Sequence, residues 1–306
     1  MRSLPLAVAL TVVGCASGPT RHVEPVESLR VSALVVEPLR SSGGATVEEI
    51  AALSARLGLR TVADASGRAL VWGPSEIHPL HPERTDWTAT DALLLLQASA
   101  VPPQEVLLLR ARLESASAAG RQEVAPVHGA VDQGASAETT YRARVELLHP
   151  STGRMVVESS AEARVDPFRV DEPGVGPLLD RVVDDALAAL EPRWSRPVRP
   201  PLDVWRLLGG DSGESGLEGE VKRLSRLRLA NPGLGEDEAA RLLRRPPGVY
   251  VRTTLVEARL RGGDVVVQVN GTSAGLEALE RLRILGKDAR LEVQAAEGSA
   301  RRVRWP

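Results

Sequence analysis

The only thiol in this chain of 306 residues, Cys15, follows an apolar run near its start. Arg2 supplies one positive charge, and residues 4–13 carry none. An uncharged run of about ten residues is typical of the core of a signal peptide and is too short to span a bilayer. A single cysteine cannot form an internal disulfide, and an exposed free thiol is a liability in an oxidising compartment. Residues 1–14 are therefore expected to be an export signal.

Val12-Val13-Gly14-Cys15 has the order aliphatic, aliphatic, small, cysteine and resembles the lipobox of bacterial lipoproteins. The resemblance implies cleavage before Cys15, diacylglycerol on its sulfur and an acyl group such as palmitate on the new amino terminus. Two or more acyl chains give a stable membrane anchor. By analogy with enteric lipoproteins, Ala16 in place of aspartate favours the outer membrane, facing the periplasm. The alternative is an ordinary signal peptide followed by an incidental cysteine.

Ser212 is a second residue whose setting suggests covalent chemistry. The run Gly210-Asp211-Ser212-Gly213 resembles the nucleophile motif of trypsin-like proteases, but Glu214 replaces the next glycine of that family. No histidine lies in the family's Ala-Ala-His-Cys setting. A serine nucleophile needs a positioned base and an oxyanion hole, and the sequence identifies neither. A linker is the favoured interpretation, and a serine hydrolase with Ser212 as nucleophile is the alternative.

Candidate ligand residues are few. His78, His81 and Glu83 have a spacing that suits a metal, but a proline follows each histidine and no third strong ligand is evident. The loop 41–46 offers backbone amides to an anion, yet it lacks a P-loop lysine and the GxGxxG spacing. Three acidic residues are interpreted as the solvated face of a helix: Asp180, Asp184 and Asp185. We expect no catalytic site, no metal and no cofactor.

Composition narrows the class of protein. The chain has 38 Lys+Arg and 40 Asp+Glu, a net charge of −2, so no overall basic field indicates a nucleic-acid partner. Aromatic residues make up 3%, so the cores must be built from Leu, Val and Ala. The length suits about two domains. No second apolar run is long enough to cross a membrane.

The elements of the first domain follow from hydrophobic periodicity. Residues 29–37 read as a buried strand, and Thr46 with Glu49 forms a capping box for a helix. Further elements are a short strand at 68–72, a helix at 90–99, three alternating strands at 106–114, 140–148 and 154–165, and a closing helix at 175–190. Residues 149–153 form the turn of a hairpin, and 119–137 form a long loop. The order β-α-β-α-β-β-β-α predicts a mixed α/β domain over 29–191, behind a tether at 15–28.

The stretch LLHPSTGRMVVES and the order of elements around it resemble the periplasmic domain of curli-secretion-type lipoproteins, which penicillin-binding-protein-activator lipoproteins share. In those families a similar turn joins the same two strands, and Thr152-Gly153-Arg154-Met155 matches it. The resemblance implies a binding or assembly role without catalysis. A membrane pore is ranked last, because strands 140–165 carry too much charge on their polar face.

Residues 192–220 are rich first in Pro and Arg and then in Gly, Ser and Glu, which indicates a linker. After it, GGDVVVQVNG at 262–271, a helix at 276–285 and strands at 289–294 and 301–305 are similar to the PDZ domain of bacterial envelope proteases and secretion proteins. The resemblance implies a small β-rich domain over 221–306. Such domains bind an extended peptide as an added strand beside a groove helix.

Carried over by position, the groove lies between the helix 276–285 and a strand at 224–229, with 236–243 as the intervening helix. The candidate peptide-binding residues are Leu227, Leu229, Leu276, Leu279, Leu282, Lys222 and Arg223. Lys222 and Arg223 would assist in holding a carboxylate. Residues 220–223 lack the glycine-containing carboxylate loop of the family, so a domain used only as a docking surface is an equal alternative.

The sequence thus predicts an α+β or α/β, lipid-anchored protein of the cell envelope that acts as a non-catalytic binding, assembly or scaffold factor. Its partners are expected to be envelope proteins or peptides, together with the membrane through the N-terminal lipid. The sequence does not identify the partner or the oligomeric state.

Overall fold

The computed structural model describes residues 20–23, 29–43, 45–65, 67–74, 101–117, 139–165, 174–197, 199–209 and 216–305. Over these residues the protein has mixed α+β content, with two sheets and five α-helices. Several of the features discussed above lie outside the described residues: Cys15, His78, His81, Glu83, the helix expected at 90–99, the loop 119–137 and Ser212.

The first sheet is mostly antiparallel, with a parallel edge. Its order is β1 (Thr20–Val23), β7 (Met155–Val165), β6 (Thr139–Leu148), β5 (Val106–Ser117), β2 (Ala33–Val36) and β4 (Leu70–Trp72). A short β3 (Arg40–Ser42) also pairs with β5. Strand β2 is parallel to β4 and β5, whereas β5, β6, β7 and β1 pair antiparallel. The expected hairpin of β6 and β7 is confirmed.

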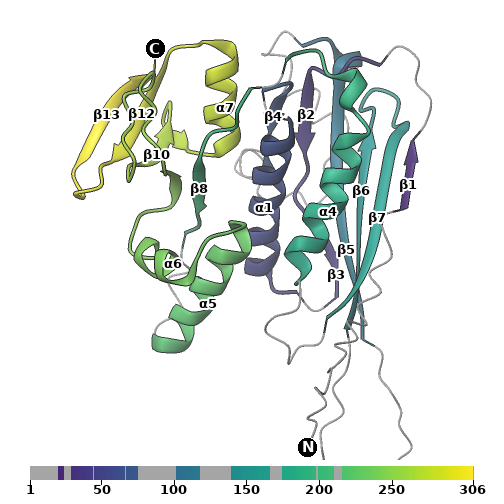
Figure 1. Ribbon diagram of the computed structural model, residues 1–306, viewed down its shortest axis with the longest axis horizontal. Helices are drawn as coiled ribbons and strands as arrows, with labels where there is room; N and C mark the ends of the chain where they lie inside the picture. The colour runs from purple at the N-terminus through teal and green to yellow at the C-terminus, as the bar shows by residue number, and fades with distance from the viewer. Residues whose placement is uncertain are drawn as a thin grey trace, which may run out of the picture.

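Alternation along β5–β7 separates an apolar face from a charged one. Leu109 and Leu147 are fully buried on one face, while the other face carries ion pairs such as Arg144 with Glu158 at 3.1 Å. Helices α1 (Val47–Ala65) and α4 (Val175–Ala188) cover the apolar face (Figure 1). This face is buried because successive strand residues point to opposite sides and only one set is hydrophobic.

The capping box at the start of α1 is confirmed. The Glu49 carboxylate accepts a hydrogen bond from the Thr46 backbone N–H at 2.8 Å, and the Thr46 hydroxyl accepts one from the Glu49 N–H at 3.2 Å. These bonds satisfy amides that have no partner within the helix.

The second sheet is antiparallel, in the order β13 (Ala300–Trp305), β12 (Ala289–Gln294), β10 (Val265–Val269), β9 (Gly248–Val251) and β8 (Val204–Leu207). The short β11 (Thr272–Ser273) pairs with β10 across a turn in which Asn270 and Gly271 have φ of 52° and 85°. Helix α7 (Leu276–Leu285) packs on one face of this sheet, and α5 (Gly216–Ala230) and α6 (Glu236–Leu242) pack on the other (Figure 1).

Strand β8 lies at the end of its sheet, and its outer edge is closed by side chains. The buried Asn231 amide accepts a hydrogen bond from the Arg206 N–H at 2.7 Å and donates one to the Arg206 carbonyl at 2.8 Å. Just before the strand, the Leu202 N–H donates to the Glu280 carboxylate of α7 at 2.8 Å. Helix α1 contacts both α5 and α7 and therefore stands along this edge. An edge satisfied and covered in this way does not offer an open template for another strand.

The Arg56 guanidinium joins the two halves of the molecule. From α1 it makes a bidentate pair with Asp180 of α4, at 2.8 and 2.6 Å, and donates to the Leu229 carbonyl of α5 at 2.9 Å. A Cβ on Gly176 would lie 2.7 Å from this guanidinium, so α4 needs a glycine there. Arg56 is 7% exposed, and such burial is tolerable only because the charge is paired and its N–H groups are bonded.

A second set of contacts docks α7 on the first sheet. The Arg281 guanidinium lies 4.7 Å from the centre of the Trp72 ring and donates to the Val71 carbonyl. The buried Glu277 carboxylate fits against Gly58 and Gly73, where a Cβ would lie within 2.3 Å of it. One hydrophobic cluster also runs from Leu34 and Leu109 through to Leu279. The two sheets therefore share a continuous core.

Three sequence expectations are wrong. Residues 224–229 are not a strand, because they belong to helix α5. The linker expected at 192–220 contains strand β8 and the start of α5, so the second unit begins before residue 221. The tether expected at 15–28 contains β1, which pairs with β7 from Thr20↔Ser160 to Val23↔Val157.

Asn231→Ala tests the closure of the β8 edge. The substitution leaves the Arg206 N–H and carbonyl without their partner, so we expect a loss of about 2–3 kcal/mol in the free energy of unfolding. Urea titration followed by tryptophan fluorescence measures this, with the exposed Ser225→Ala on α5 as the control. A loss no larger than that of the control would contradict the closure.

Candidate binding site beside strand β8

The seven candidate peptide-binding residues do not form one groove. Leu276 and Leu279 are 5% and 0% exposed and belong to the core, and Leu282 packs against it. The half-buried Leu229 also packs on this core, and the exposed Lys222 pairs with Glu218 at 2.9 Å. The groove expected between 224–229 and α7 is absent, because 224–229 is helical and its Leu224 and Leu227 pack in the cluster on the opposite face of the sheet. Only Arg223 and Leu227 meet, and they do so in a pocket.

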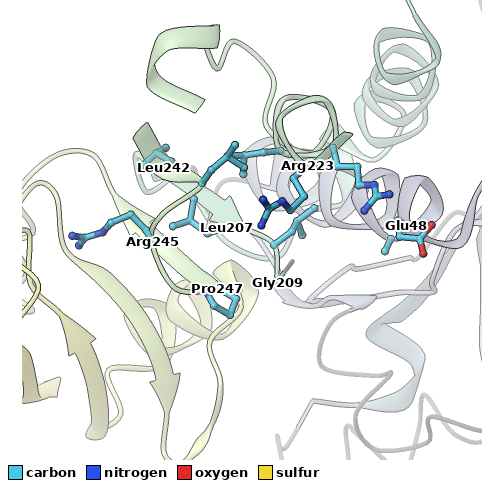
Figure 2. A pocket seen from close by; sticks show the side chains of 12 residues that line it. Glu48, Leu207, Gly209, Arg223, Leu242, Arg245 and Pro247 are labelled. Atoms are coloured by element: carbon cyan, nitrogen blue, oxygen red, sulfur yellow. The ribbon is translucent and has the colours of Figure 1, made fainter. Parts of the chain in front are cut away.

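This pocket has a volume of about 400 Å³ and lies where four elements meet (Figure 2). Strand β8 and the two residues after it supply one wall, α5 a second, α6 and the turn after it a third, and the first turn of α1 the fourth. The lining residues are Glu48, Ala51, Leu207, Leu208, Gly209, Arg223, Arg226, Leu227, Leu242, Leu243, Arg245 and Pro247. We refer to it as the β8 pocket.

The floor of the β8 pocket is apolar and rigid. Leu207, Leu227 and Leu242 are each at most 5% exposed and belong to a small cluster with Trp205. The Trp205 ring stacks with Tyr250 at 6.1 Å, with the Arg252 guanidinium 4.3 Å from its centre. Apolar side chains held in a packed cluster favour contact with a hydrophobic group of a ligand.

Two arginines of the pocket have contrasting surroundings. The Arg245 guanidinium donates to the carbonyls of Gly263, Ala295 and Ala296 at 2.9–3.0 Å and thereby ties α6 to the second sheet. The Nε atoms of Arg223 and Arg245 are both shielded from solvent without a hydrogen-bond partner. In Figure 2 Arg223 lies between Leu207 and Glu48, over the pocket. Arg245 is thus structural, whereas the Arg223 guanidinium makes no hydrogen bond or ion pair among the residues that the structure describes.

The β8 pocket places charged groups beside apolar side chains. Its described lining contains no serine, threonine, cysteine, histidine or lysine, and its one carboxylate is that of Glu48. Guanidinium groups are permanent cations and donate to carboxylates in a fixed fork. Arginines beside a floor of leucine side chains are therefore suited to hold an anion that is attached to an apolar group.

A second hollow, between α1 and α4, is lined by ion-paired side chains. The Arg60 guanidinium donates to Asp184 at 2.6 Å and lies 3.6 Å from Asp64. The aspartates of α4 were expected to face solvent, and this is wrong for Asp180 and Asp184, which face the arginines of α1. Burial, and then the hydrogen bond and charge of Asp184, raise the pKa of Asp64 to about 7.

Two further properties concern the described part of the chain. No group of three or more His, Cys, Asp or Glu side chains is arranged there to hold a metal ion. No helix among those residues is both long and apolar enough to cross a membrane.

Comparisons with known proteins leave the family open. No family model matches the sequence, and no curated protein matches it. Among solved structures, the chain is similar to a PelC dodecamer from Paraburkholderia phytofirmans, with 14% identity, 58% of this chain and 99% of that chain covered, and a TM-score of 0.30. The hypothetical protein CT253 from Chlamydia trachomatis has 12% identity, coverage of 53% and 97%, and a TM-score of 0.30. A neuraminyllactose-binding hemagglutinin homolog from Helicobacter pylori has 12% identity, coverage of 54% and 79%, and a TM-score of 0.24. Likenesses this distant support no argument about function.

Asp64 predicts a pH dependence of stability. Its pKa of about 7 lies above the ordinary value of 3.8, so the folded state binds more protons than the unfolded state between about pH 4 and pH 7. Stability should therefore fall as pH rises through this window. Asp64→Asn should remove that part of the slope and make the protein more stable than wild type above pH 7.

Urea titrations at pH 5, 6, 7 and 8 measure this effect, with the exposed Asp288→Asn as the control. An unchanged slope in Asp64→Asn would show that the burial of this carboxyl does not set the pH dependence.

Proposed function

We propose that this chain is a lipid-anchored cell-envelope protein that binds other envelope proteins or peptides, without catalysis, as an assembly or scaffold factor. The observation that carries the proposal is the β8 pocket, which presents Arg223 above a leucine floor and has no serine, threonine, cysteine, histidine or lysine among its described lining residues. A largely apolar pocket with a few charged groups is typical of a ligand-binding site.

The second unit is proposed to be a PDZ-like domain whose usual groove is filled. The order of β8, two helices, β9, the β10–β11 hairpin, α7, β12 and β13 supports the likeness. The edge of β8 is bonded to Asn231, and the leucines of α7 are in the core. Binding is therefore placed in the β8 pocket, on the opposite face of the sheet from α7.

The lipobox-like segment supports an anchor at Cys15. Four residues, 16–19, separate Cys15 from the first strand, Thr20–Val23. Five Cα–Cα steps span at most about 18 Å, so a lipid on Cys15 would keep the first sheet close to the membrane. Holding a binding protein at a surface raises its effective concentration near membrane-bound partners.

Cys15→Ser tests the anchor. Wild-type protein should incorporate radiolabelled palmitate and sediment with membranes, and Cys15→Ser should do neither while keeping the same thermal unfolding curve. Ser17→Ala, two residues further on, is the control and should behave as wild type. Equal labelling of the Cys15→Ser variant would rule out lipid on this thiol.

Photo-crosslinking in cells tests the binding role. A photoreactive phenylalanine at Leu243, in the β8 pocket, should give discrete adducts with other envelope proteins. The same group at Val256, which is 79% exposed and outside the pocket, is the matched control. Adducts at neither position would contradict a binding role. A fluorophosphonate probe that labels Ser212 would instead support the serine-hydrolase alternative.

A further inference from the structure

The Arg223 guanidinium of the β8 pocket has no hydrogen bond or ion pair among the described residues. Arg223 is half-buried on α5, and its Nε is shielded from solvent without a hydrogen bond. The Nε of Arg245 lacks a hydrogen bond as well, but its Nη atoms donate to backbone carbonyls, and the buried Arg56 guanidinium donates to Asp180 and to the Leu229 carbonyl. A guanidinium partly removed from water gains most when a carboxylate or similar anion pairs with it.

The protein surface next to Arg223 suits an extended chain. The β8–β9 ladder ends at Leu207↔Gly248, so Leu208 and Gly209 continue past it along the pocket wall. Pro246 and Pro247, which precede β9, have no backbone N–H that could bond to the carbonyls of Leu208 and Gly209. Backbone groups just beyond the end of a ladder can form hydrogen bonds with the backbone of a bound peptide segment. A lipid has no peptide backbone and would not use these groups.

The charges of the pocket favour a single negative charge. Glu48 on the α1 wall opposes a ligand group that carries two charges, such as a phosphate monoester. Of the two other arginines in the lining, Arg226 already has a partner and Arg245 is held by backbone carbonyls. One carboxylate on Arg223 therefore matches the site better than a doubly charged group does.

We propose that the β8 pocket binds an extended segment of a partner protein in which a carboxylate is flanked by apolar side chains. The carboxylate pairs with Arg223, and the apolar neighbours rest on Leu207, Leu227 and Leu242. This deepens the proposed function and rests on it, because it names what the binding surface recognises. The carboxylate comes either from an acidic side chain or from the end of the partner chain.

Fluorescence anisotropy with short labelled peptides tests the proposal on the full chain purified in detergent. The first peptide, LVELV with an amidated end, carries an internal carboxylate, and its LVQLV counterpart carries none. A third, LVQLV with a free end, carries only the terminal carboxylate. We expect one or both carboxylate peptides to bind at least about fivefold tighter than amidated LVQLV, because a charge-assisted hydrogen bond is stronger than a neutral one.

Arg223→Gln should abolish this preference, and Arg223→Lys, which keeps the charge, should retain part of it. Arg228→Gln is the matched control, because Arg228 lies on the same helix but is exposed and 3.8 Å from Glu236, outside the pocket. The identity of the tighter carboxylate peptide tells which source the site takes.

Equal affinity for all three peptides, or a preference that survives in Arg223→Gln, would overturn the proposal. So would a change in the sedimentation of Arg223→Gln with no effect on peptides, because the pocket would then hold a second copy of this chain. None of these failures removes the binding role itself, which the adducts at Leu243 in cells test separately.

Discussion

The arrangement of the molecule depends on the buried guanidinium of Arg56. It reaches from α1 to a carboxylate on α4 and to a backbone carbonyl on α5, and so ties together helices from both halves of the chain. A buried cation without these partners would cost several kcal/mol, which makes the three-way contact specific to one arrangement. The absence of a side chain at Gly176 gives the guanidinium its room. With α1 held in this way, the two sheets share one core.

The same contact determines which surfaces are open to partners. Because α1 contacts both α5 and α7, it lies along the outer edge of β8, where Asn231 already bonds to Arg206. The leucines of α7 are then needed inside the core and are not available to a ligand. The first turn of α1 also forms a wall of the β8 pocket on the other face of the sheet. The position of α1 thus both covers the outer edge of β8 and completes the β8 pocket on the opposite face of the second sheet from α7.

Much of the fold could be predicted because its signals are local. Period-two alternation indicated β5, β6 and β7, and Thr46 with Glu49 marked the start of α1. Asn270-Gly271 marked a tight turn, and the bounds of α7 and β12 agree with the structure. Residues 224–229 of α5 were taken for a strand because they were placed by position from the PDZ resemblance, with 236–243 as the intervening helix. The helical signal of α5 is the spacing of Leu217, Val221, Leu224 and Leu227 by four, three and three residues.

The site was harder to predict because it depends on contacts between distant residues. No sequence pattern indicates that Arg56 pairs with Asp180, which lies 124 positions away. Without the structure, an aspartate on a helix is expected to face solvent. Strand β8 is only four residues long and lies in a stretch rich in proline and glycine. Arg223 and Leu227 were chosen for a groove that does not form, yet they line the β8 pocket because α5 turns both toward β8.

Hydrogen exchange at the β8 edge tests the central claim most directly. The account predicts that the amide of Arg206, bonded to the buried Asn231 and covered by α1, exchanges as slowly as amides within β9 of the same sheet. Mass spectrometry of overlapping peptides that cover residues 202–207 and 248–251 measures both in the full chain. Exchange of the Arg206 amide within seconds, as at an open strand edge, would contradict the claim that the protein closes this edge with its own residues.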